Sequence, residues 1–163
     1  MAMTLVILGL SAPRVATSLR SYRMMNDARG IASQLALARS RAAANFTQAR
    51  INFDLTNRSY ELQLWDKATN DFDVTEGGAQ YLSGGIGFGF GGIGLPAGAQ
   101  TTIQQSPEII FNSRGTPVDD TGAATGNYVI YLSNDAGQCS AISVSTSGKV
   151  SVSWWNGSDW QAR

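Results

Sequence analysis

The sequence predicts an α+β protein in which one long N-terminal α-helix packs on a mostly antiparallel β-sheet domain. Two observations favour this fold class. Apolar residues recur every three or four positions through residues 15–42, which is the period of an amphipathic helix. Beyond residue 48 apolar and polar residues alternate, and short polar or Gly-containing turns separate the alternating runs. The 163 residues are enough for one domain with an extension.

The first element is expected to be one helix with two parts. Residues 1–12 are uncharged and mostly apolar, but at about 1.5 Å per residue they cover only about 18 Å, less than the roughly 30 Å of a bilayer core. From residue 14 the helix is amphipathic, and we expect it to end near Asn45, a residue type that tolerates a left-handed cap. The stripe expected to pack on the sheet consists of Leu19, Tyr22, Ile31, Leu35, Ala38 and Ala42.

The rest of the chain is expected to form about six to eight short strands. Segment 66–80 is expected to be a polar loop or an irregular hairpin, and Gly84–Gly94 a mobile loop whose apolar residues dock on the core or on a partner. The chain is therefore divided into a hydrophobic helix segment (1–13), an amphipathic helix (14–46) and a β-rich globular domain (47–163). The expected strands are 50–54, 59–65, 101–105, 108–111, 127–133, 141–145 and 149–155.

Composition argues against most enzymes. The sequence has no His, which removes Ser/His/Asp and Cys/His nucleophile arrangements and every His-ligated metal site. Cys139 is the single cysteine, so the chain has neither an internal disulfide nor a paired-cysteine zinc or redox motif. We therefore expect a protein that is not an enzyme and that uses no cofactor and no metal ion.

The charges are unevenly distributed along the chain. Twelve basic and twelve acidic residues cancel, but residues 1–50 carry seven Arg against Asp27 alone, a net charge of +6. The remaining residues carry five basic and eleven acidic groups, a net charge of −6. The basic part is either an ordinary solvated helix face or a surface that contacts anionic lipid or acidic neighbouring subunits.

Three further features have both a chemical and a structural interpretation. Gly84–Gly94 lacks the Gly-Lys-Ser/Thr ending of a phosphate-binding loop, which favours an ordinary loop. The paired Asp119 and Asp120 could serve a hydrolase, although adjacent Asp residues in a turn are more often solvated. The C-terminal tryptophans are either a stacking platform or a cap on the core and sheet edge; they are Trp154, Trp155 and Trp160.

Three parts of the chain together carry a family resemblance, and the first of them, the N-terminal helix, does so through its start and its end. The apolar start at Leu5–Pro13 and the helix end Leu35–Ala42 (LALARSRA) are similar to the N-terminal region of type IV pilin-like proteins. More narrowly, the chain resembles the minor pseudopilins of the general secretion pathway H (GspH)/FimT group. The segment Ile110–Pro117 is similar to that group's I-x-F-x-x-x-G-x-P pattern, and Ile142–Val150 to its closing I-x-V-x-x-x-G-x-V hairpin.

The start of the sequence departs from that family. Pilin-like proteins carry a short basic leader and then a Phe-Thr-Leu-x-Glu sequence, which the prepilin peptidase cleaves and methylates, and neither precedes Leu5 here. If Pro13 matches the family's helix proline, we expect Met1 to lie inside the mature protein. Adding about nine apolar residues to those observed would give about 20, enough to span a bilayer.

The resemblance implies a minor subunit of a type II secretion pseudopilus or a type IV pilus, acting in filament tip assembly and protein export. It implies a single-pass inner-membrane helix with the β-domain in the periplasm, and partners that are other pseudopilins or pilins, membrane lipid, and secreted cargo or DNA. A DNA-binding minor pilin for DNA uptake is the alternative, motivated by the excess of Arg and by the aromatic residues. The residues assigned to the membrane or filament core are Leu5, Val6, Ile7, Leu8, Leu10 and Pro13.

Overall fold

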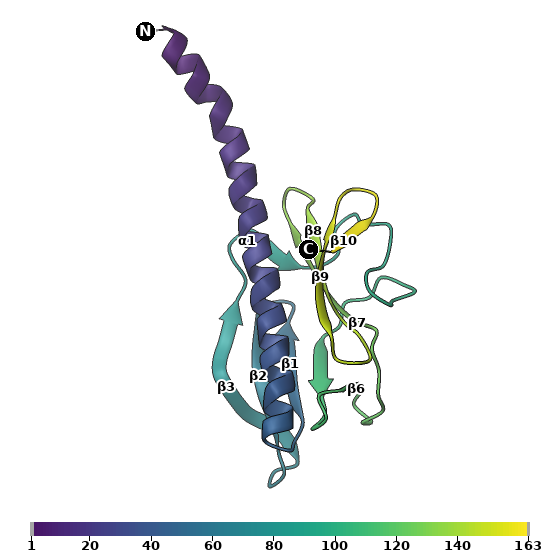
Figure 1. Cartoon of the computed structure of the whole chain (residues 1–163). Helices are drawn as coiled ribbons and strands as arrows, with labels where there is room; N and C mark the ends of the chain where they lie inside the picture. The colour runs from purple at the N-terminus through teal and green to yellow at the C-terminus, as the bar shows by residue number, and fades with distance from the viewer. Residues whose placement is uncertain (1, 163) are drawn as a thin grey trace.

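A computed structural model describes the backbone of residues 2–162 and the side chains of residues 18–162. Over this range a long helix, α1 (Ala2–Ala44), is followed by ten strands, as Figure 1 shows. The strands are β1 (Ala49–Asp54), β2 (Ser59–Asp66), β3 (Asp71–Tyr81), β4 (Ile86–Phe88), β5 (Glu108–Phe111), β6 (Pro117–Val118), β7 (Tyr128–Asn134), β8 (Cys139–Val144), β9 (Val150–Trp155) and β10 (Trp160–Ala162).

The strands form two five-stranded sheets rather than the single sheet expected. Sheet A has the order β3-β2-β1-β5-β6 and sheet B the order β10-β9-β8-β7-β4. All neighbouring strands are antiparallel, so the expected α+β class is confirmed. The number of sheets was not accessible to the sequence pattern, because alternation fixes which face of a strand is buried but not which strands pair.

Helix α1 lies over both sheets and completes one hydrophobic core. Its buried residues from Met24 to Ala42 pack with Ile51 of β1 and Ile109 of β5 in sheet A, and with Ile130 of β7 and Ile142 of β8 in sheet B. The part of the helix near its N-terminus extends beyond the strands (Figure 1). In the part of the chain that the structure describes, no helical stretch combines the length and the apolarity needed to cross a lipid bilayer.

The helix ends at Ala44, next to Asn45 as expected, but its left-handed residue is Phe46 and not Asn45. Phe46 has φ of 49°, the amide of Phe46 bonds to the carbonyl of Ala43 at 3.4 Å, and the amide of Thr47 bonds to the carbonyl of Ala42 at 3.1 Å. These two bonds satisfy carbonyl groups that the end of a helix leaves without partners. The expected cap position is therefore corrected from Asn45 to Phe46.

Sheet A follows the simple alternation that its sequence shows. In β1, Ala49, Ile51 and Phe53 are buried toward α1, whereas the residues between them face away from the helix. Ile51 lies opposite Leu62 on β2, and the same inward face continues there. The segment expected as a polar loop or irregular hairpin is a hairpin arm, because β3 runs the full length of β2 with two irregularities in its register.

Sheet B is buried on both faces. Its inner face packs on α1, and its outer face is covered by the segment between β4 and β5, from which Ile93 and Ala97 pack on Val129 and Tyr131. The Gly-rich segment 84–94 therefore contains a short strand, β4, and a docked residue, Ile93, and the expectation of a loop over its whole length is corrected.

The strand expected at 101–105 is absent from the described structure. The edge of β7 is bonded there by side chains and by one backbone bond, from the Ser106 amide to the Val129 carbonyl oxygen at 3.1 Å. The Gln105 side-chain oxygen accepts the amide of Tyr131 at 2.9 Å. The Ser106 hydroxyl likewise accepts the amide of Val129 at 3.1 Å. Polar side chains thus take the place of some ladder bonds, which alternation alone does not reveal.

Candidate interaction surface

The stripe predicted on α1 divides into a buried and an exposed part. Ile31, Leu35, Ala38 and Ala42 are completely buried in the core between the two sheets. Leu19 and Tyr22 are 52% and 61% exposed, so the expectation that they pack on the sheet is wrong. The described core contacts of α1 begin at Met24, and the stripe continues beyond that point as exposed apolar surface.

The residues predicted for a membrane or filament core lie outside the part of the structure whose side chains are described. They are Leu5, Val6, Ile7, Leu8, Leu10 and Pro13, whose backbone belongs to α1.

Arg39 connects the helix to two distant turns. Its Nη1 donates to the carbonyl oxygen of Gly148 at 3.2 Å. A Cβ atom placed on Gly115 would lie 2.9 Å from Arg39 Nε, and one placed on Gly148 would lie 2.4 Å from the Gly115 carbonyl oxygen. Both glycines have positive φ, 73° and 76°, so their turns need glycine for conformation as well as for space. We call this arrangement the Arg39 cradle.

The cradle joins the three segments that carry the family resemblance. Arg39 belongs to the helix end, Gly115 to the turn between β5 and β6, and Gly148 to the turn between β8 and β9. No local pattern indicates that these segments meet, because 76 and 109 residues separate Arg39 from the two glycines. Their meeting gives the three motifs one structural explanation, the close approach of two turns to a helical Arg side chain.

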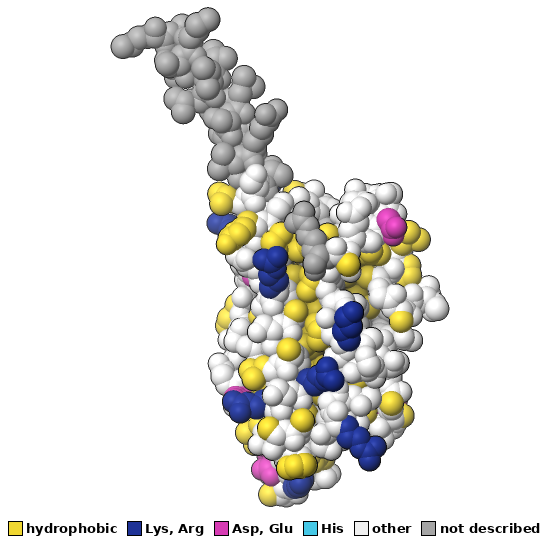
Figure 2. Space-filling view, in the orientation of Figure 1, with side chains coloured by type: hydrophobic (Ala, Val, Ile, Leu, Met, Phe, Trp, Pro, Cys, Tyr) yellow, Lys and Arg dark blue, Asp and Glu magenta, His cyan; other side chains and the backbone are white. Residues whose placement is uncertain are grey.

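A groove beside the cradle is lined by basic residues. Its volume is about 580 Å³, and Arg39, Arg114 and Lys149 contribute the charged side chains. None of the described residues that line it is acidic. We call it the basic groove. Figure 2 shows the face of the molecule with α1 in front: Lys and Arg side chains are spread over it, and acidic side chains lie toward its edges.

Sequence reasoning missed the basic groove, although a signal for it was present. Arg114 directly precedes Gly115 and Lys149 directly follows Gly148, so each turn carries a cation next to a glycine with positive φ.

A second pocket lies on the face of sheet A that points away from α1. It has a volume of about 320 Å³, and its acidic side chains are Asp71, Glu108 and Asp120. We call it the acidic pocket. Arg50 lies within it, where Nε donates to the side-chain oxygen of Gln63 at 2.6 Å and Nη1 to Glu108 Oε2 at 3.1 Å.

Aromatic side chains form one wall of the acidic pocket. The rings of Trp65 and Phe72 meet edge to face with centroids 5.0 Å apart, and the Arg50 guanidinium carbon lies 4.3 Å from the centre of the Phe72 ring. Arg50 neutralises Glu108, which leaves Asp71 and Asp120 as the charges that face solvent. Carboxylates beside aromatic faces suit a cationic side chain.

The acidic pair Asp119–Asp120 is held by its own turn. Asp119 Oδ1 accepts bonds from the Thr121 hydroxyl at 2.7 Å, the Thr121 amide at 3.0 Å and the Ala123 amide at 2.9 Å. The Thr121 hydroxyl bond is the main reason why the pKa of Asp119 lies below its usual value. Asp119 Oδ1 is thus engaged in holding the turn, which favours the structural interpretation of Asp119.

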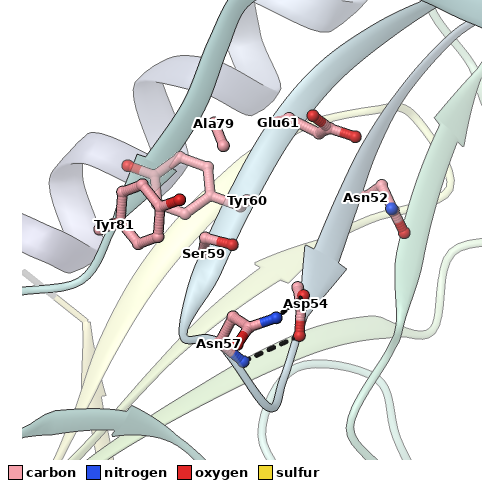
Figure 3. Close-up of a pocket in the computed structure, with 8 residues that line it drawn as sticks. All are labelled: Asn52, Asp54, Asn57, Ser59, Tyr60, Glu61, Ala79 and Tyr81. Carbon is pink, nitrogen blue, oxygen red and sulfur yellow. Dashed lines mark hydrogen bonds between the residues drawn. The ribbon is translucent and has the colours of Figure 1, made fainter.

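A further pocket lies at the β1–β2 turn, has a volume of about 380 Å³ and is lined mostly by polar residues, which Figure 3 labels. Asn57 donates to Asp54 through its backbone amide at 2.9 Å and through its side-chain amide at 2.6 Å. These bonds, the backbone bond first, hold the pKa of Asp54 below its usual value. Burial and then the charge of Asp27 raise the pKa of Tyr60, so its hydroxyl stays protonated at neutral pH.

The tryptophans at the C-terminal end help to cover sheet B. Trp160 donates from Nε1 to the carbonyl oxygen of Leu95 at 2.9 Å, and its ring lies 5.9 Å from that of Tyr131. Trp154 packs against the core under α1, and Trp155 and Trp160 pack on the opposite face. This arrangement favours the structural interpretation of these residues over a stacking platform.

Comparison with known proteins finds similarity among solved structures. No family model and no curated protein matches the sequence. The structure of the minor pseudopilin EpsH from the type 2 secretion system of Vibrio cholerae superposes with a TM-score of 0.54 at 12% identity, covering 85% of this chain and 95% of that one. A second structure of EpsH covers 77% of this chain and 89% of its own, with a TM-score of 0.48 and 12% identity. The helix over two antiparallel sheets is thus the fold of a minor pseudopilin, as the resemblance of the three sequence segments implied.

Proposed function

We propose that the chain is a minor pseudopilin, a structural subunit that acts in tip assembly of a type II secretion pseudopilus or type IV pilus and in protein export. The observation that carries this proposal is the division of α1 into a part buried in the β-domain and a part that projects from it. The described core begins at Met24, and the helix extends N-terminally from there to Ala2, about 33 Å at a rise of 1.5 Å per residue.

The projecting part of α1 is proposed to act by packing. Before assembly it lies in the inner membrane with the β-domain in the periplasm, and on assembly it exchanges lipid for the helices of other subunits. Lipid tails are as apolar as Leu5 or Ile7, so little is gained by their transfer, and close helix packing supplies the driving force. The small residues Gly9, Ser11 and Ala12 favour such close approach.

The exposed apolar residues of α1 support the same proposal. Leu19 and Tyr22 lie just before the buried part of the helix, where apolar side chains have no place in the subunit's own core. We propose that other subunits cover them in the filament.

Photo-cross-linking in the native host tests this function. A photoreactive amino acid at Tyr22 is expected to cross-link to the helices of other subunits of the same filament. Tyr81, which is 71% exposed on β3, is the control matched in residue type, and it is expected to give no helix cross-links. The proposal fails if deletion of the gene leaves filaments and export unchanged, or if Tyr22 gives no intersubunit product while filaments form.

A DNA-binding minor pilin is the second candidate, and the basic groove is the observation that favours it. The β-domain as a whole carries an excess of acidic residues, which opposes binding to a polyanion. DNA binding would weaken steeply as the salt concentration rises, so a titration of the whole chain with duplex DNA at two salt concentrations separates the two functions.

A further inference from the structure

We propose that the basic groove of one copy binds the acidic pocket of a second copy, so that like subunits associate head to tail through their β-domains. This inference rests on the proposed function, because it supplies a contact between filament subunits. It concerns the β-domain and not the projecting helix, and therefore can fail while the proposed function stands.

The first step is that the groove presents uncompensated positive charge. Arg39 is fixed by its bond to the Gly148 carbonyl, and Arg114 and Lys149 are exposed at the two turns that meet there. A partner that fills such a groove needs carboxylate groups, because several like charges brought together without counter-charges repel one another.

The second step is that the same chain carries a surface of the required chemistry. Asp71 and Asp120 are exposed at the acidic pocket, and Arg50 within the pocket is already engaged with Glu108 and Gln63. Phe72 is buried and its ring already faces the Arg50 guanidinium, so Trp65, which is partly exposed beside these carboxylates, is the aromatic side chain that can receive the guanidinium or ammonium group of a second copy.

The third step is that the two surfaces point in different directions. The groove lies along α1, which covers the inner face of sheet A. Arg50 and Ile110, which line the acidic pocket, alternate with the inward residues Ile51 and Phe111 and therefore belong to the opposite face of the sheet. A groove on one face and its complement on the other give a heterologous contact, in which each copy uses a different surface, rather than a two-fold symmetric one.

The position of the groove also argues against a lipid headgroup as its occupant. Arg39 lies 37 residues along α1 from Ala2, about 55 Å at 1.5 Å per residue, whereas a bilayer with its headgroups is about 40–45 Å thick. If the N-terminal end of α1 lies in the membrane, the groove is beyond the reach of the headgroups.

Cysteine cross-linking tests the contact and its polarity. Two variants of the full chain, Lys149→Cys and Asp120→Cys, are prepared in a Cys139→Ala background, mixed in detergent micelles and oxidised. A cross-linked dimer is expected from the mixture and not from either variant alone. Asp135→Cys, also exposed but in the turn between β7 and β8, replaces Asp120→Cys as the matched control and is expected to give no product.

Charge exchange gives the second measurement. Arg114→Glu with Lys149→Glu, and separately Asp71→Lys with Asp120→Lys, are each expected to weaken self-association of the full chain at least tenfold by sedimentation in detergent. A mixture of the two double variants is expected to recover association, because the intact acidic pocket of the first variant meets the intact basic groove of the second, and the two charge-reversed surfaces also attract each other. Folding defects cannot produce this recovery, and the wild-type contact is expected to weaken with added salt.

Several outcomes overturn the inference. Cross-linking of Lys149→Cys to itself would indicate a symmetric contact between grooves, and absence of recovery in the charge exchange would show that the two surfaces are not partners. Loss of salt-sensitive DNA binding in the groove variant would assign the groove to DNA. If Tyr22 still cross-links to other subunits in the host while these results are negative, the proposed function stands and only this contact is wrong.

Discussion

At the scale of single residues, two glycines explain how turns that are far apart in the sequence can lie close to the same helical Arg side chain. Gly115 and Gly148 each combine a positive φ with a neighbour that leaves no room for a side chain. Gly137 also has a positive φ, 73°, but nothing lies within 4 Å of the place where its Cβ would be. Substitutions at Gly148 and at Gly137 can therefore separate the cost of a left-handed backbone from the cost of steric crowding.

The substitution Gly148→Ala is expected to destabilise the fold more than Gly137→Ala. Alanine at either site adopts a left-handed conformation, which costs about 1–2 kcal/mol. At Gly148 the new methyl group also meets the Gly115 carbonyl oxygen, and overpacking adds about 1–3 kcal/mol. Urea unfolding of both variants measures the difference. Equal losses of unfolding free energy would show that the Arg39 cradle has room for the added methyl group.

The Asp119 turn predicts a dependence of stability on acid pH. The pKa of Asp119 is lowered in the folded chain, mainly by the Thr121 hydroxyl, so its contribution is present above the unfolded value near 3.8 and is lost as the pH falls through the lower folded value. Asp119→Asn is therefore expected to flatten the decline of unfolding free energy below pH 4. Asp135→Asn is the control, and identical pH profiles for wild type and Asp119→Asn would contradict the expectation.

At the scale of elements, the helix shows what hydrophobic periodicity can and cannot predict. The period of 3.6 residues placed Ile31, Leu35 and Ala38 on the buried face, because the helix is covered by strands along that length. The same period continued to Leu19 and Tyr22, which are exposed. Periodicity reports a stripe of apolar residues but contains no information about where the covering sheets end.

Two leucines of α1 test this division. Leu35→Ala is expected to lower the free energy of unfolding by about 2–5 kcal/mol, because the side chain is completely buried between the sheets. Leu37→Ala, two residues later, is expected to cost less than about 1 kcal/mol, since Leu37 is 38% exposed. Thermal and urea unfolding compare the two variants. Similar losses of unfolding free energy would contradict the assignment of Leu35 to the buried face of α1 and of Leu37 to its exposed face.

The strands show a second limit of sequence reasoning. The β8–β9 hairpin was predictable because Ile142 and Val144 alternate on one side of Ser147-Gly148 and Val150 and Val152 on the other. Residues 101–105 were also expected to form a strand, but the contact with β7 is made by the side chains of Gln105 and Ser106 and by the Ser106 amide, and no strand forms over 101–105. Whether a segment pairs as a strand depends on the strand that lies beside it in the fold, here β7, and a short stretch of sequence does not contain that information.

At the scale of the whole molecule, the fold gathers charged residues that are far apart in the sequence into local surfaces of one sign. The sequence showed a basic first third and an acidic remainder, but it did not show that Arg114 and Lys149 join Arg39 at one groove. Nor did it show that Asp71, Glu108 and Asp120 surround Arg50. Such surfaces gather residues from turns far apart in the chain, so only the tertiary structure assembles them.

The extent of the core predicts how much of α1 the β-domain needs. A chain that begins at Ser18 is expected to unfold within about 3 °C of the full chain, because the helical residues of the described core begin at Met24. A chain that begins at Asn26 loses Met24 and is expected to unfold at a clearly lower temperature. Calorimetry of the three chains distinguishes the cases, and a large loss already at Ser18 would mean that the domain boundary lies further upstream.

Helix α1 packs on β1 and β5 of sheet A and on β7, β8 and β9 of sheet B, so it connects the two sheets through one core. Traction on its N-terminal end would strain many side-chain contacts at once, in shear along the axis, and neither half of the head could be peeled away first. A subunit built in this way is suited to being pulled through its N-terminal helix while its β-domain stays folded.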